Sequence, residues 1–89
     1  MQSIHGLTYG HLGILLREKG FLEVIDERGR AYTHPSNARL LLPPVEDADP
    51  VRAHHFVATR GMLDDFDLMP RDAFELRLLQ LAHPAMVAA

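Results

Sequence analysis

Three side chains with useful chemistry, Arg30, Tyr32 and His34, alternate along a segment that favours a β-strand. Side chains two residues apart in a strand point to the same face, so the spacing places a guanidinium, a phenol and an imidazole together. Cleavage of RNA through its 2′-hydroxyl needs a base near neutral pKa and a group that stabilises phosphorane charge. His34 and Arg30 are therefore the candidate catalytic residues. The competing interpretation is an exposed strand face that ends in a turn histidine.

Arginine supplies eight of the nine Lys and Arg residues, and its fork suits phosphate well. The candidate RNA-binding residues are Arg28, Arg30, Tyr32, Arg52 and Arg60. Arg52 and Arg60 lie eight residues apart on a predicted helix, a little over two turns, so both can face a phosphate backbone. The acids that flank them favour local ion pairing as the alternative.

The positions of the remaining histidines favour a role in packing over metal binding. His54 and His55 are adjacent on the predicted helix and point about 100° apart, so they do not form a chelating pair. We expect His55 to be structural, through a hydrogen bond across to the sheet. His5 and His11, with Asp64, Asp65 or Asp67, fit no familiar ligand spacing. We therefore expect no metal. Glycine-rich phosphate loops, serine-nucleophile motifs and paired catalytic carboxylates are also absent, and we expect no cofactor.

Composition indicates one globular domain without strong charge. The chain has 89 residues, 47% of them hydrophobic, and a net charge of −3. Residues 1–43 carry +1 and residues 44–89 carry −4, which does not match a strongly basic nucleic-acid binder. The absence of cysteine excludes a disulfide framework, a zinc ribbon and a thiol nucleophile. Without a signal sequence or a long apolar run, we expect a cytoplasmic protein with no membrane partner.

Apolar spacing and turn residues predict six elements. Helices are expected over 9–19, 50–65 and 71–82, and strands over 21–26, 30–34 and 38–42. Thr8 is the expected N-cap of the first helix, and Asp49 followed by Pro50 is the expected start of the second. Gly10 and Gly13 weaken the first helix, so either packing must supply the lost stability or a strand must come close to that face.

The order predicts an α+β fold, with a three-stranded antiparallel sheet packed by helices. The order is α-β-β-β-α with an added C-terminal helix, in two layers. We expect a single domain over 1–89 with its core at about 8–82 and loose ends at 1–6 and 84–89. Leu40, Leu41 and Leu42 occupy both sides of the third strand, so the sequence leaves its buried face open.

Four short words in the chain carry a family resemblance. They are LREKGF at 16–21, AYTHP at 31–35, LLLPP at 40–44 and TRGML at 59–63, and an arginine-x-x-histidine step is matched by Arg52 and His55. In order and spacing these words resemble the HicA/YcfA-like toxins of bacterial toxin–antitoxin pairs, which have a double-stranded-RNA-binding-like fold. The resemblance runs from Thr8 to about Leu79.

The resemblance implies a small ribonuclease that cleaves messenger RNA and is neutralised by a HicB-like antitoxin. The family's catalytic histidine lies on the second strand, and its position falls here on Gly29, or on Arg30 if the hairpin shifts by one residue. Neither residue can act as a general base. The hypothesis we favour is a HicA-like module that binds nucleic acid or protein. The alternatives are a ribonuclease with a relocated histidine, and a domain that homodimerises through its sheet edge.

Overall fold

The first helix begins where the sequence predicts. The computed structural model of the chain describes residues 6–83, in which helix α1 spans Tyr9–Glu18. Thr8 caps it: its hydroxyl accepts from the His11 N–H at 3.3 Å, and His11 Nδ1 accepts from the Thr8 N–H at 3.1 Å. This reciprocal pair satisfies two donors that an unbonded helix start would leave free. Of the expected loose ends at 1–6 and 84–89, all residues except Gly6 lie outside the described range.

A glycine in α1 lets the sheet approach closely. A Cβ on Gly13 would lie 3.0 Å from the Tyr32 hydroxyl and 3.2 Å from a Glu23 carboxylate oxygen. Of the two expected compensations, packing or a close strand, the structure shows side chains of β1 and β2 packed against Gly13.

Three strands form an antiparallel meander in the order β1-β2-β3. Strand β1 spans Leu22–Asp26, β2 spans Gly29–Thr33 and β3 spans Arg39–Leu42. Val24 lies opposite Ala31, and Ala31 lies opposite Leu41. Leu40 and Leu42 are buried while Leu41 is exposed, which decides the face that the sequence left open.

The second helix starts later than predicted. Helix α2 spans Ala53–Asp65, and its N-cap is Arg52, not Asp49. The expected start at Pro50 is wrong because the chain there is extended: Pro50 bridges Thr8, and the Val51 N–H donates to the Leu7 carbonyl at 2.9 Å. This short pairing ties the start of α2 to the start of α1.

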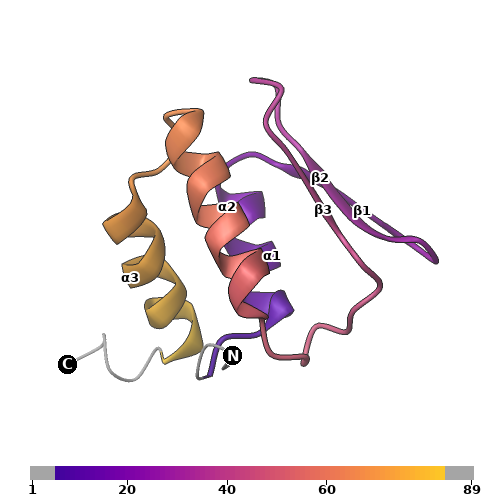
Figure 1. Cartoon of the computed structure of the whole chain (residues 1–89). Helices are drawn as coiled ribbons and strands as arrows, with labels where there is room; N and C mark the ends of the chain where they lie inside the picture. Colours follow the sequence, from indigo (N-terminus) through magenta and orange to yellow (C-terminus); the bar gives the residue numbers. More distant parts are fainter. Residues whose placement is uncertain (1–5, 84–89) are drawn as a thin grey trace.

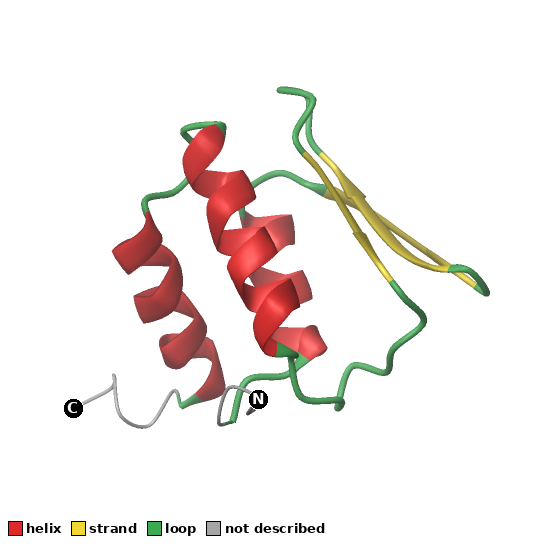
Figure 2. Cartoon of the chain, viewed as in Figure 1, coloured by secondary structure: helices red, strands yellow, loops and turns green. Residues whose placement is uncertain are grey.

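Helix α3 spans Arg71–Ala82, as predicted, and buries Phe74 and Leu78. The α+β class and the order α-β-β-β-α-α are confirmed. All three helices lie on one side of the sheet (Figure 1), with α1 and α2 against it. Helix α3 packs on α1 and α2 away from the sheet, so it adds a layer to the two expected (Figure 2).

Candidate functional site

The predicted set on β2 faces the helices, not solvent. Arg30 and Tyr32 share one face, as the spacing predicts, and both are buried against the helical layer. His34 follows the strand and is partly exposed. Four residues of extended chain span about 13 Å, so the backbone alone holds His34 well away from Arg30.

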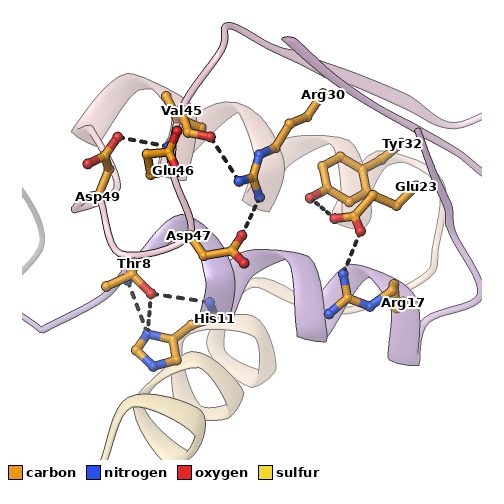
Figure 3. Close-up of polar contacts among 10 residues, drawn as sticks. All are labelled: Thr8, His11, Arg17, Glu23, Arg30, Tyr32, Val45, Glu46, Asp47 and Asp49. Atoms are coloured by element: carbon orange, nitrogen blue, oxygen red, sulfur yellow. Dashed lines mark hydrogen bonds and ion pairs between the residues drawn. The ribbon is translucent and has the colours of Figure 1, made fainter. Parts of the chain in front are cut away.

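Arg30 is held by the loop between β3 and α2. Its guanidinium donates to Asp47 at 2.8 Å through Nη1 and to the Val45 carbonyl at 2.8 Å through Nη2 (Figure 3). The Arg30 side chain is 5% exposed, whereas that of Asp47 is 78% exposed. Burial opposes the charge, but Asp47 and Tyr32 outweigh it and raise the pKa of Arg30. This cation therefore attaches a surface loop to the covered face of the sheet.

Tyr32 belongs to a second chain of contacts on the same face. Its hydroxyl donates to Glu23, which also accepts from Arg17 of α1 at 2.8 Å (Figure 3). Burial, and then the hydrogen bond to Glu23, raise the pKa of Tyr32 to about 12. The phenol is thus a structural donor that is neutral at physiological pH.

A shallow hollow beside these contacts is lined by His11 and Arg17 of α1, Asp47 of the loop between β3 and α2, and Arg30 of β2. It offers two guanidiniums, but each already pairs with a carboxylate: Arg17 with Glu23, and Arg30 with Asp47. A phosphate entering here would have to displace one of these carboxylates. The arrangement can orient the loop, and it presents no uncompensated positive charge at this place.

His34 is oriented by its own turn. The Ser36 N–H donates to His34 Nδ1 at 3.0 Å, and the Ser36 hydroxyl lies 2.8 Å from the same nitrogen. An Nδ1 that accepts a backbone hydrogen bond leaves the ring proton on Nε2. The ring also packs on Phe21, with centroids 4.9 Å apart. His34 thus serves as a turn and packing residue in this structure, with one ring nitrogen free of these bonds.

The other predicted RNA-binding residues lie on separate elements. Arg28 is in the β1–β2 turn and is 3.7 Å from Asp26. Arg52 is exposed at the N-cap of α2. Arg60 turns toward α3, where it pairs with Glu75 at 3.4 Å and lies over the Phe56 ring. The structure does not bring these guanidiniums together into one phosphate-binding surface.

His55 has a structural partner, although not the expected one. Its Nδ1 lies 2.6 Å from the hydroxyl of Tyr9 on α1, so the bond joins two helices and does not cross to the sheet. The Tyr9 oxygen accepts from the Arg52 N–H at 3.3 Å, which leaves the hydroxyl hydrogen for His55. Burial, then the nearby His54 and Arg52, lower the pKa of His55.

Gly29 is one of the two positions, with Arg30, on which the resemblance would place a histidine. Its φ is +134°, and a Cβ there would lie 2.1 Å from the carbonyl oxygen of Leu42 on β3. No side chain fits this backbone without moving the neighbouring strand. The sheet therefore has no room for a side chain at this position.

The feature that sequence reasoning missed is the opposite face of the sheet. Leu22, Val24 and Leu41 point away from the helices and are 67%, 51% and 69% exposed. Ala31 lies between Val24 and Leu41 in the register, so the apolar side chains are contiguous across all three strands. Within residues 6–83 no element covers this face (Figure 2). The sequence did contain a signal for this apolar face, because Leu22 and Val24 flank Glu23 in β1. Alternation along a strand does not, however, say which of its two faces the helices cover.

A metal site, a membrane span and a family match would each assign a role to this chain, and none of the three was found for the described residues. Across the described residues, no three His, Cys, Asp or Glu side chains come together as a metal site, and His5 lies outside that range. No helix in the same range is long and apolar enough to cross a bilayer. Comparisons with protein-family models, curated proteins and solved structures gave no match to this chain. The functional argument therefore rests on the geometry above.

Proposed function

We propose that this chain is a protein-binding module that presents the open face of its sheet to a partner. The observation that carries the proposal is the contiguous exposed surface of Leu22, Val24, Ala31 and Leu41. Soluble domains rarely leave clustered large apolar side chains uncovered, and such patches are typical of protein interfaces. Burying them on a partner would gain free energy in proportion to the apolar area removed from water.

The dimensions of the face favour an amphipathic helix as the partner segment. Three strands spaced at about 4.8 Å span about 10 Å, which is the diameter of an α-helix with its side chains. Charged side chains border the face at both ends. Arg39 shares a row with Leu22 at one end, and Asp26 lies 3.7 Å from Arg28 beside the turn at the other. A partner helix with an apolar stripe flanked by polar residues would fit this surface.

The cations favour protein over RNA as the partner class. Arg30 is buried, and Arg17 and Arg60 are paired with carboxylates. Binding RNA through these residues would require breaking pairs that tie the fold together. Arg28 and Arg52 are exposed, but they lie on separate elements, the β1–β2 turn and the N-cap of α2. Within the resemblance to HicA-like toxins, the protein partner would be a HicB-like antitoxin, and such a protein is the first candidate to test.

Binding can be tested with one disruptive variant and one matched control. Leu41→Lys places a charge on the open face, on its outer strand β3, while Leu79→Lys places the same charge at an exposed position of α3. We expect Leu41→Lys to abolish binding of a HicB-like protein or amphipathic helix, and Leu79→Lys to leave this binding unchanged. Nuclear magnetic resonance shift changes from that partner should centre on β1, β2 and β3. Equal binding by both variants, or shifts centred elsewhere, would refute the proposal.

The ribonuclease alternative makes a separate prediction. If His34 acts as the base, purified protein should cleave RNA at about pH 6–8, and His34→Ala should abolish the cleavage. We expect intact RNA, because the sheet places Arg30 too far from His34 to assist at the same phosphate. Cleavage that depends on His34 would replace the binding role with a nuclease.

A further inference from the structure

Strand β1 is an outer strand of the sheet, and its outer edge is poorly protected. Within the described residues, β1 pairs only with β2. Proteins usually guard such edges with proline, lysine or a bulge, because unpaired backbone groups invite another strand. Leu22–Asp26 contains no proline or lysine, and its five residues pair with β2 without a bulge. The other outer strand, β3, is shorter, begins with Arg39 and is followed by two prolines.

Apolar side chains lie on both faces of β1 at this edge. Leu22 and Val24 are on the open face. Ile25 is opposite Arg30, on the side of the helices, yet it is 55% exposed. The helical layer therefore stops short of the outer edge. A strand that is apolar on both exposed faces gains most when the sheet continues beyond it, because both faces then receive a neighbour.

We propose that β1 pairs with β1 of a second copy of this chain, antiparallel about a two-fold axis at Val24, to make one six-stranded sheet. This register uses all five residues of the strand and keeps both open faces on the same side. Lys19 precedes the strand, Asp26 is its last residue and Glu27 follows it. Antiparallel pairing places the basic end of each copy beside the acidic end of the other, twice by symmetry.

The dimer extends the open apolar face of each copy into one surface that is twice as wide. Its two halves are related by the two-fold axis, so a dimeric partner can occupy both at once. The pairing uses the edge of β1, whereas the proposed partner site uses the face of the sheet. The two proposals can therefore fail independently.

Light scattering after size exclusion, over a range of concentrations, tests the dimer directly. The chain has a mass of 10.0 kDa, and we expect the measured mass to rise toward twice that value as concentration increases. A constant monomer mass up to the highest soluble concentration would overturn the proposal.

Two substitutions at one exposed position test the register. In this pairing, Ile25 lies opposite Glu23 of the second copy. Ile25→Glu places like charges opposite each other twice and should weaken the dimer by at least about tenfold. Ile25→Lys places opposite charges there and should weaken the dimer clearly less than Ile25→Glu. Equal weakening by both variants would overturn the proposed pairing.

A third variant separates the dimer from partner binding. Leu41→Lys changes the open face on β3, the strand farthest from the proposed two-fold axis. We expect this variant to dimerise as the unmodified chain does, even where it no longer binds a partner. Loss of dimerisation with Leu41→Lys but not with Ile25→Glu would place the contact on the face of the sheet and overturn pairing at the β1 edge.

Discussion

Substitution of Gly29 by alanine should be among the most damaging small changes in this protein. The backbone there has φ of +134°, a conformation that costs a residue with a Cβ about 1–3 kcal/mol. The added Cβ would also lie 2.1 Å from the Leu42 carbonyl oxygen, far inside contact distance. Relief requires β3 to move away from β2, which would weaken one or two ladder hydrogen bonds worth about 0.5–1.5 kcal/mol each. We therefore expect Gly29→Ala to lower the free energy of unfolding by about 3 kcal/mol.

Urea denaturation followed by circular dichroism measures this loss, and Gly61 supplies the matched control. A Cβ on Gly61 in α2 meets no atom within 4 Å, so Gly61→Ala should raise the free energy of unfolding by about 0.5–1 kcal/mol. Gly29→His, which would restore the histidine of the resembled family, should be at least as damaging as Gly29→Ala. A loss below about 1 kcal/mol for Gly29→Ala would refute the steric reasoning.

Two further predictions concern buried polar pairs. The lowered pKa of His55 means that the folded state favours the neutral ring, so stability should fall as pH decreases through the ordinary value of 6.5. The difference in unfolding free energy between the unmodified chain and His55→Gln, measured from about pH 8 to pH 5, should therefore shrink on acidification; a constant difference would contradict the linkage. Asp47→Ala leaves the buried Arg30 cation without its carboxylate and should cost about 1–2 kcal/mol, less than for a fully buried pair because Asp47 is mostly exposed. Arg30→Met removes the buried charge and should cost under about 1 kcal/mol in the same urea assay, because Asp47 remains hydrated; a larger loss for Arg30→Met than for Asp47→Ala would show that the arginine is needed for more than charge pairing.

Local signals in the sequence were sufficient for most of the elements. Thr8 caps α1, and α3 spans Arg71–Ala82 as its apolar spacing predicts. The start of α2 was misplaced because Asp49 and Pro50 carry a local helix-start signal. Their backbone instead pairs with the segment before α1, and this long-range pairing outweighed the local preference.

The sequence by itself determined the α+β class, the order of elements and the shared face of Arg30 and Tyr32, because these depend on periodicity and on nearest neighbours along the chain. Only the tertiary structure decided which face of the sheet the helices cover. That choice buried Arg30 and Tyr32 with Asp47 and Glu23 as partners, and it left Leu41 in solvent. The two-residue period of a strand defines two faces but does not say which one is buried. The packing of α1 and α2 decides this. It covers the face with Arg30 and Tyr32, so the candidate site becomes the opposite, apolar face.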